Sequence, residues 1–572
     1  MKKMNKENIQ IKDICVSGID NFKKNNLLEA ENLFKKVLNI KPNHEEANFF
    51  LGLVYANLNS VNKAKEFFAK TIEINVNHID AHYNLGIIFD IQRQYEKSIE
   101  HYKKAIDLNS NFAIAYNNLG LVFYKTREYE KAIECYNKAI DLNPNSQNHV
   151  DAYNNLGNVY KELEQYENAI ACYKKAISIK PNFAMVHNNL GITFYHLKKF
   201  ENAKNSYQNS IEINPNYEGA HNNLGILFKE LGQYKKAISQ YEKVIQINPN
   251  HADAHFGLGI LLILLSNFEK GFKEYEWRNK LRKNLFITKD IESLEWQGED
   301  LTNKRILILS EQGTGDIIQF SRYLYLLQDQ YSANIIFRTK KNLIHLFSKN
   351  KFKLISDEEP IPQHDFHKLL LSLPQMFYQK KKTFPKQINF IPKNENIALK
   401  WKNKLKDIKG FKVGINWQGR KSYGVDHLRS IPLFYYEKLF TIEKINFINL
   451  QKGFGTEQIK DFKYKDKLYD FSSEIDNGDN AFEDTIGILQ NLDLIITSDT
   501  ALPHLSSTLG IKTWVLLHYS PDWRWFLKSK DSVWYKNLTL YRQEKVDNWN
   551  TVFDSVKKDL VVSLKETNHN TI

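Results

Sequence analysis

The chain of 572 residues is too long for a single compact core, because an average domain holds about 150 residues. Its composition of 42% apolar and 25% charged residues is that of globular proteins and excludes wholesale disorder. The formal net charge is +13, but residues 1–290 carry +6 and the remainder +7, so neither half is a basic domain. Lysine outnumbers arginine 68 to 11, and such a compositional bias explains the charge without a ligand. We therefore expect no nucleic-acid partner.

The cysteines and the apolar runs bear on the compartment. Cys15, Cys135 and Cys172 form no C-x-x-C pair, so the sequence predicts neither a disulfide framework nor a structural zinc site. The N-terminal sequence MKKMNKENIQIKD has no apolar stretch after its lysines and does not resemble a signal peptide. The longest strongly apolar run, residues 256–265, is about half of what a bilayer span requires. These features predict a cytoplasmic protein without a transmembrane segment, and peripheral membrane contact stays open.

Glycines recur through the N-terminal half in steps of 34 residues, with one step of 37. Small residues such as Gly157 and Ala169 let two helices approach closely, aromatic residues such as Tyr173 fill the gap between them, and Pro181 ends the second helix. This period and these residue types predict about eight tetratricopeptide repeats over residues 1–284, stacked as an all-α solenoid with a concave groove. The glycines are Gly18, Gly52, Gly86, Gly120, Gly157, Gly191, Gly225 and Gly259.

Asparagines stand just before several of these glycines and suggest a binding surface. An amide side chain has donors and an acceptor and can pair with both sides of a peptide backbone. A column of them could hold an extended peptide without reading its sequence, or it could brace neighbouring turns. The pattern resembles the asparagine ladder in the repeat domain of O-linked N-acetylglucosamine transferases. We expect a protein or peptide partner in a groove lined by Asn84, Asn118, Asn155, Asn189 and Asn223.

From Arg305 onward, short apolar runs alternate with segments of helical spacing, which predicts an α/β region with parallel sheets. We expect a linker over 285–302, one Rossmann-like lobe over 303–384 and a second over 411–545. A lysine-rich interlobe linker spans 385–410, and a crossover helix returning toward the first lobe, with a tail, spans 546–572. Ligands of such sheets bind at the carboxyl ends of the strands. The expected strands are RILILS, ANIIF, KLIS, KLLLSL, KVGINW, INFINL, DLIITS and TWVLL.

Two loops at strand ends carry candidate chemistry. In the first, EQGTGDIIQ, Asp316 opens a helix, where its carboxylate could accept a proton from an attacking hydroxyl or simply cap the helix. In the second, TSDTALPH, backbone N–H groups at a helix start suit an anion such as a pyrophosphate. There Asp499 and Thr500 could orient sugar hydroxyls or cap the helix, and His504 could donate to a phosphate or pack.

Six motifs in order carry a family resemblance: EQGTGDIIQFSRYL, GINWQG, HLRSIPL, LQKG, SDTALPHLSSTLG and YSPDWRWFL. Over residues 305 to about 545 the chain resembles the heptosyltransferase-like glycosyltransferases of family 9, in the branch fused to tetratricopeptide repeats. Ser310, Pro503 and Ser507 depart from the family pattern. The resemblance implies a GT-B fold, with the acceptor in the first lobe and the nucleotide-sugar in the second.

The resemblance also implies roles for residues. Asp316 matches the catalytic base, and the acceptor loop contains Gln312, Gly313, Gly315 and Gln319. No D-x-D triplet occurs, so we expect no metal and no cofactor beyond the nucleotide-diphosphate sugar as co-substrate. The donor-binding residues implied in the second lobe are Arg429, Gln451, Lys452, Ser498, Asp499, Thr500 and His504.

We therefore expect a glycosyltransferase that moves a sugar from a nucleotide-diphosphate sugar to a protein, glycan or lipid acceptor recruited by the repeats. Asp316 would remove the acceptor proton while Arg429 stabilises the leaving diphosphate. Two alternatives stay open. One is an interaction scaffold with a vestigial transferase domain, and the other is a protein glycosyltransferase like the O-linked N-acetylglucosamine transferases.

Overall fold

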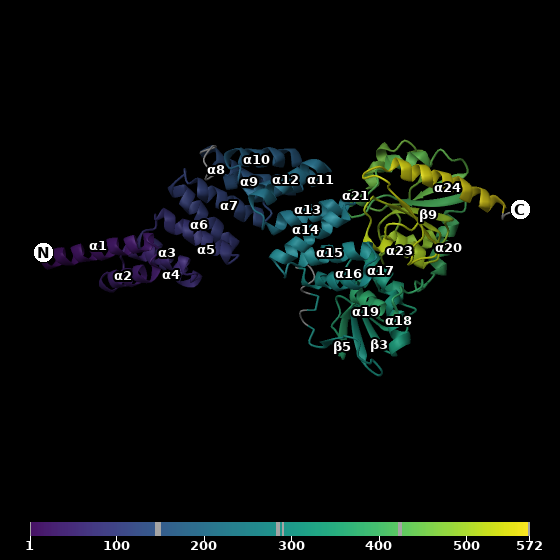
Figure 1. Ribbon diagram of the computed structural model, residues 1–572, viewed down its shortest axis with the longest axis horizontal. Helices are drawn as coiled ribbons and strands as arrows, with labels where there is room; N and C mark the ends of the chain where they lie inside the picture. Colours follow the sequence, from purple (N-terminus) through teal and green to yellow (C-terminus); the bar gives the residue numbers. More distant parts are fainter. Residues whose placement is uncertain (1, 143–149, 282–286, 289–290, 421–425, 570–572) are drawn as a thin grey trace. The chain divides into compact units, whose positions relative to one another are not determined.

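The computed structural model describes residues 2–142, 150–281, 287–288, 291–420 and 426–569 (Figure 1). Its contacts divide the chain into two compact units, Met1–Ala220 and His221–Ile572. The described residues of the first unit form helices joined by short turns. The second unit begins inside the repeats and includes both sheets, so the last repeat helices pack together with the α/β region.

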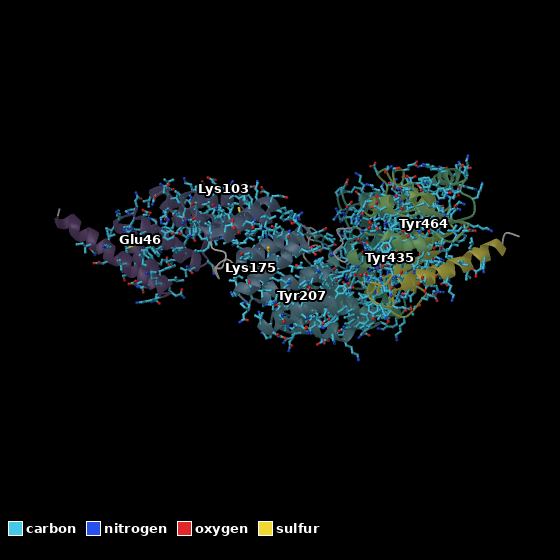
Figure 2. All side chains as sticks on the ribbon, turned by 90° about the horizontal axis from the view of Figure 1, so that it is seen from above. Glu46, Lys103, Lys175, Tyr207, Tyr435 and Tyr464 are labelled. Carbon is cyan, nitrogen blue, oxygen red and sulfur yellow. The ribbon has the colours of Figure 1, made fainter. Side chains whose placement is uncertain are left out.

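The first unit is a series of antiparallel helix pairs. The second helix of each pair is amphipathic, so its charged residues such as Lys103 and Lys175 are exposed and its aromatic residues such as Tyr207 are buried (Figure 2). The pairs are α1 (Lys2–Lys23) with α2 (Leu27–Ile40), α3 (Glu45–Asn57) with α4 (Val61–Ile74), α5 (Ile79–Ile91) with α6 (Tyr95–Leu108), α7 (Ala113–Lys125) with α8 (Tyr129–Leu142), α9 (Val150–Glu162) with α10 (Tyr166–Ile179), and α11 (Ala184–His196) with α12 (Phe200–Ile213).

Each repeat glycine of the first unit is covered by the aromatic ring sixteen residues later. A Cβ added at Gly157 would lie 2.6 Å from Cε1 of Tyr173, and one added at Gly52 would lie 2.6 Å from Cε1 of Phe68. The ring of the second helix therefore rests on the backbone of the first. This contact explains why the period carries glycine and an aromatic residue at fixed offsets.

The last repeat helices lie in the second unit, which begins at His221, within the first of them. A Cβ added at Gly225 would lie 2.9 Å from Cε1 of Tyr241, as in the earlier repeats. The final pair is followed by a short 3-10 helix where the repeat pattern breaks down. These elements are α13 (Glu218–Glu230), α14 (Tyr234–Ile247), α15 (Ala252–Leu264), α16 (Phe268–Tyr275) and η2 (Glu276–Lys280).

The first sheet has five parallel strands in the order β1-β5-β2-β3-β4. Its central strand, RILIL, is buried over four of its five residues, as expected for a strand covered on both faces. The strands are β1 (Leu294–Glu295), β2 (Arg305–Leu309), β3 (Asn334–Thr339), β4 (Lys353–Ser356) and β5 (Phe366–Leu369), and the helices are α17 (Thr314–Phe320), α18 (Arg322–Tyr331), η3 (Lys341–Phe347), η4 (Leu370–Ser372) and α19 (Leu373–Lys381).

The second sheet has six parallel strands in the order β11-β10-β9-β6-β7-β8. Its strands are β6 (Phe411–Asn416), β7 (Ile445–Asn449), β8 (Leu468–Tyr469), β9 (Leu494–Ser498), β10 (Thr513–Leu517) and β11 (Leu538–Arg542). Its helices are α20 (Glu395–Lys404), α21 (Asp426–Arg429), η5 (Leu433–Lys438), η6 (Thr456–Asp461), η7 (Lys465–Lys467), α22 (Glu483–Leu489), α23 (Leu502–Thr508), η8 (Trp523–Trp525) and α24 (Asn550–His569).

Three segments differ from the sequence-based boundaries. Within the expected linker 285–302, Leu294 and Glu295 form β1 beside β5, and Trp296 is fully buried. Within 385–410, helix α20 buries Trp401 against α22.

The C-terminal helix α24 differs as well, because it packs on the second sheet through the face formed by Val552, Phe553, Val556 and Leu560. The sequence predicts that this helix returns toward the first lobe. Instead, its apolar face is buried against the second sheet. No helix in the described ranges is long and apolar enough to cross a membrane.

Candidate functional site

The two loops singled out in the sequence meet in the structure. Each follows the carboxyl end of a central strand, β2 in the first sheet and β9 in the second, and each leads into a short helix. A Cβ added at Gly315 would lie 3.1 Å from Cδ2 of His504 and 3.3 Å from Cα of Ala501. The glycine is needed there for the close approach of the two lobes.

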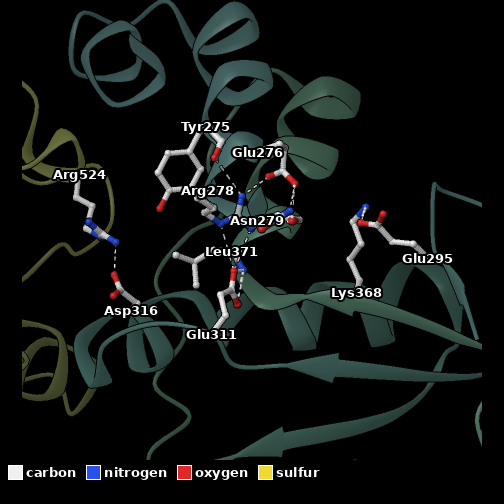
Figure 3. A network of polar contacts seen from close by, with 11 residues as sticks. Tyr275, Glu276, Arg278, Asn279, Glu295, Glu311, Asp316, Lys368, Leu371 and Arg524 are labelled. Atoms are coloured by element: carbon white, nitrogen blue, oxygen red, sulfur yellow. Dashed lines mark hydrogen bonds and ion pairs between the residues drawn. The ribbon is translucent and has the colours of Figure 1, made fainter. Parts of the chain in front are cut away.

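Asp316 has two partners, one within its own loop and one in the other lobe. Its Oδ2 accepts the backbone N–H of Gly313 at 3.0 Å, which caps α17. Its Oδ1 is ion-paired with a guanidinium nitrogen of Arg524 (Figure 3). Arg524 also donates to Asp522 Oδ1 at 2.6 Å. Burial raises the pKa of Asp316, and the Arg524 guanidinium opposes that rise.

Arg429 and Asp499 lie in the same region of the second lobe. Arg429 donates from Nη1 to the backbone carbonyl of Asp499 at 2.8 Å and from Nε to Asp426 Oδ1 at 2.9 Å. Burial, and then the negative charge of Asp522, raise the pKa of Asp499 to about 6, against the opposing effect of Arg429. Carboxylates and guanidinium groups are therefore concentrated at one edge of the two sheets.

The raised pKa of Asp499 predicts a pH-dependent stability. A group whose pKa is higher in the folded state stabilises the fold below its unfolded pKa of about 4, and this contribution is lost as the pH rises through about 6. As the pH rises from 4.5 to 7.5, we expect the free energy of unfolding of Asp499→Asn to increase by on the order of 1–2 kcal/mol relative to that of the wild type. Urea unfolding at several pH values measures this difference. Parallel curves for the two proteins would contradict it.

Gln451 and Lys452 follow the end of β7, and both make several contacts within the protein. The Gln451 carbonyl oxygen accepts from Asn416 Nδ2 at 2.7 Å and from the Gln418 N–H at 3.0 Å, while its amide donates to the Phe454 carbonyl at 2.7 Å. Gln451 thus braces the loop after β6. Lys452 donates three times, to the carbonyls of residues 475 and 476 at 2.5 Å and to Asn477 Oδ1 at 3.2 Å.

The remaining residues of the donor loop are buried or make local contacts. Thr500 Oγ1 accepts the N–H of Leu502, two residues along the chain, at 3.3 Å, while the N-cap of α23 is Ala501. His504 is buried, stacks on Trp525 and lies 3.1 Å from the Tyr535 hydroxyl through Nδ1. Burial lowers the pKa of His504 well below its ordinary value, so the ring is neutral. Ser498, at the end of β9, is fully buried.

The acceptor loop holds two glutamines with unsatisfied amides. Gln319 is fully buried, and neither its amide nitrogen nor its carbonyl oxygen has a hydrogen-bond partner within the protein. The amide nitrogen of Gln312 is likewise buried without a partner. A buried polar group without a partner is costly, so these amides are suited to a ligand or a water molecule.

The end of the repeats contributes a buried arginine to the first loop, which the sequence did not reveal. Arg278, in η2, is fully buried and donates to Glu311 Oε1 at 3.0 Å, to Glu276 Oε1 at 2.5 Å and to Ser372 Oγ at 2.7 Å (Figure 3). Glu311 begins the loop that carries Asp316. Burial raises the pKa of Glu311 to about 7, against the opposing effect of Arg278. The signal in the sequence was the departure of EYEWRN from the repeat pattern.

Helix α16 also contacts both lobes through aromatic side chains. Phe268 lies 5.0 Å from Tyr378 of the first lobe and 5.6 Å from Phe526 of the second, measured between ring centroids. Tyr275 lies 5.7 Å from Trp523 in the segment that carries Arg524. The SPDWRW segment, part of the last of the six motifs that carry the family resemblance, therefore lies between the last repeat and Asp316.

The asparagines of the first unit form a chain of hydrogen bonds. Asn189 donates to Asn154 at 2.9 Å, Asn155 donates to Asn117 at 3.2 Å, and Asn118 donates to the Tyr83 hydroxyl at 3.1 Å. Within a repeat, Asn154 donates to Asn155 and Asn117 to Asn118, each at 3.3 Å. The amides thus brace neighbouring repeats, and an amide has further capacity for a ligand. Asn84 instead donates to the Asp80 carbonyl of its own helix at 2.7 Å, and Asn223 lies half-buried on α13.

Among the residues that the structure describes, no group of three or more histidine, cysteine, aspartate or glutamate side chains is placed to hold an ion.

Comparisons with known proteins bear on the helical array. Family models described as tetratricopeptide repeat or TPR repeat match residues 45–78, 91–126, 111–182, 184–217, 206–239 and 227–265. The N-terminal array consists of tetratricopeptide repeats. Tetratricopeptide repeats across the first ~270 residues indicate a surface for binding other proteins.

Among curated proteins, the chain is similar to Protein FlbA of Caulobacter vibrioides, with 22% identity over 279 residues. The match covers 45% of this chain and 46% of that protein, so the chain spans about half the length of this relative.

Solved structures similar to part of the chain include MamA, with 30% identity over 29% of this chain and 94% of that one, at a TM-score of 0.27. PilF of Pseudomonas aeruginosa matches with 23% identity over 37% of this chain and 94% of that one, at a TM-score of 0.33. YrrB, described as a TPR protein with an unusual peptide-binding site, matches with 24% identity over 33% of this chain and 95% of that one, at a TM-score of 0.27.

Proposed function

We propose that this protein is a glycosyltransferase of the GT-B type, which moves a sugar from a nucleotide-diphosphate sugar to an acceptor recruited by the repeats. The observation that supports this most is the meeting of two loops at the carboxyl ends of two parallel sheets, where Gly315 approaches His504. Open parallel sheets bind their ligands at that edge. The same edge gathers the Asp316 carboxylate with the guanidinium groups of Arg429 and Arg524.

The chemistry follows from these charges. Asp316 takes the proton of the acceptor hydroxyl as that oxygen bonds to the anomeric carbon, and the bond from this carbon to the diphosphate breaks. The electron pair leaves with the nucleotide diphosphate, whose charge Arg429 and Arg524 stabilise. In the structure, Arg524 is paired with Asp316. A diphosphate that binds there competes with Asp316 for the guanidinium and so releases the carboxylate. Burial raises the pKa of Asp316, which makes it a stronger base once released.

The acceptor class follows from the repeats. A protein or peptide lying along the asparagine chain would use the remaining donors and acceptors of Asn118, Asn155 and Asn189. The buried amides of Gln312 and Gln319 would then contact the acceptor group that enters the first lobe.

The role of Asp316 predicts a large kinetic effect. With a panel of nucleotide-sugars and the purified full chain, we expect donor turnover that Asp316→Asn lowers by about 10²–10⁴-fold, because it removes the general base. Nucleotide binding by calorimetry should persist, since asparagine keeps the shape of the side chain. Turnover unchanged in Asp316→Asn would contradict the assignment of the base alone.

A second candidate is an interaction scaffold whose α/β region no longer catalyses. The observation in its favour is that the Lys452 ammonium makes three contacts within the protein and that Asp316 is held by Arg524. The same donor panel separates the two functions. Neither hydrolysis of any donor nor binding of any nucleotide would favour the scaffold.

A further inference from the structure

We propose that Arg278, at the end of the repeats, is a positioning residue for the site, because it fixes through Glu311 the loop that carries Asp316. The inference rests on the proposed function for its catalytic meaning, while its structural part is independent of it. It makes the terminal repeat a component of the catalytic unit rather than an adaptor attached to it.

The contacts of Arg278 converge from three parts of the chain. Its guanidinium pairs with Glu276 of the same 3-10 helix and with Glu311 at the start of the first loop, and it donates to Ser372 between β5 and α19. Ser372 in turn donates to Glu276 Oε2 at 2.7 Å, and the N–H of Leu371 donates to Glu311 Oε1 at 3.2 Å. One side chain from the repeats thus joins both segments that flank the carboxyl end of the first sheet.

The burial of the ion pair between Arg278 and Glu311 indicates that it orients the loop rather than stabilising the fold. The side chains of Arg278 and Glu311 have exposed fractions of 0%. Charges so deeply buried cost free energy, and apolar residues of the same volume would often hold two elements together at least as well. The planar guanidinium differs from an apolar residue because its N–H donors point in fixed directions. They therefore fix the orientation of the carboxylate that they bind. Glu311 stands five residues before Asp316, so fixing one carboxylate restricts the other.

A second ion pair between the same regions provides a matched control. Lys382, after α19, lies 3.4 Å from Glu269 of α16, and both side chains are more than half exposed. Such an exposed pair is screened by water and contributes little. Removing it changes a charge at the same interface without reaching the loop.

Hydrogen exchange on the full chain without substrate tests the positioning directly. We expect Arg278→Ala to speed exchange of the amides in residues 310–321 on the order of 10-fold, because Glu311 loses its partner. Amides of β7 in the second sheet serve as the internal reference. Lys382→Ala should leave both segments as in the wild type.

Two further variants keep the test decisive if Arg278→Ala does not fold. Arg278→Lys retains the buried charge but not the fork, and Glu311→Gln leaves Arg278 balanced by Glu276 alone. Both should also speed exchange in 310–321. Wild-type exchange in 310–321 for any folded variant among the three would overturn the proposal.

The kinetic arm separates this inference from the proposed function. Where a donor is turned over, we expect Arg278→Ala to lower kcat about 10-fold and to change the KM for that donor by less than about 2-fold. Arg278→Lys should recover part of the loss. Faster exchange in a protein that turns over no donor would support the positioning and sink the transferase. A KM effect without a kcat effect would overturn the positioning role.

Discussion

Replacing Arg524 by alanine is expected to destabilise the second unit by about 3–5 kcal/mol, because it removes the shared partner of two buried or half-buried carboxylates. Arg524 contacts Asp316 and Asp522 through different guanidinium nitrogens, and its side chain is only 9% exposed. The measurement is urea unfolding followed by tryptophan fluorescence. All nine tryptophans lie between Trp277 and Trp549, so the signal reports on the second unit.

The pH dependence of this variant distinguishes charge from packing. Without the guanidinium, the positive charge of Arg524 no longer opposes the rise in the pKa of Asp316 that burial causes. The folded state then holds its proton more tightly, so the variant loses stability as the pH rises and differs less from the wild type at pH 5 than at pH 8. Arg524→Lys should fall between the two, since one ammonium does not match both carboxylates.

The control is Lys341→Ala, which removes an exposed ion pair with Glu358 in the same unit. It should change stability by less than about 1 kcal/mol. Equal shifts of the unfolding midpoint for Arg524→Ala and Lys341→Ala would show that the pair with Asp316 is not a stabilising contact.

Gly259→Ala is expected to cost about 3 kcal/mol, because the added methyl group meets backbone rather than a side chain. A Cβ there would lie 2.4 Å from the backbone nitrogen of Tyr275 and 2.8 Å from the carbonyl carbon of Glu274. Backbone of a neighbouring helix moves only with the whole helix, and α16 is held between both lobes. The same fluorescence assay reads this change, since Trp277 stacks on His255 of α15.

Gly225→Ala is the matched variant, one repeat earlier in the same unit. The three atoms nearest its Cβ would all belong to the ring of Tyr241, the first at 2.9 Å. We expect the free energy of unfolding to change by less than about 1 kcal/mol. Alanine is about 1 kcal/mol more favourable than glycine in a helix, and the cost of moving the Tyr241 ring offsets this gain. Similar losses for the two variants would show that ring and backbone contacts constrain these glycines equally.

The sequence by itself determined the repeats and most of the central strands. From Gly18 to Gly225, each repeat glycine contacts the aromatic ring sixteen positions later, so the period of the sequence reflects the packing of each helix pair. The runs that became β2, β3, β4, β6, β7, β9 and β10 are short and mostly apolar, because parallel strands are largely covered on both faces. The sequence did not predict β1, β8 or β11. β1 and β8 have two residues each and carry no pattern, while β11, with the sequence LTLYR, is not a continuous apolar run. The run KLLLSL continues into helix after Leu369.

Only the tertiary structure decided which charges meet. Asp316 and Arg524 are 208 residues apart, and Arg278 and Ser372 are 94 apart, so no local spacing relates either pair. Arg524 stands in SPDWRW, part of a motif that carries the family resemblance, and Arg278 stands in EYEWRN, where the repeat pattern ends. These pairs form because the carboxyl ends of the two sheets and the last repeat come together in the fold. A carboxylate buried at that junction needs a cation beside it, and the two arginines supply it.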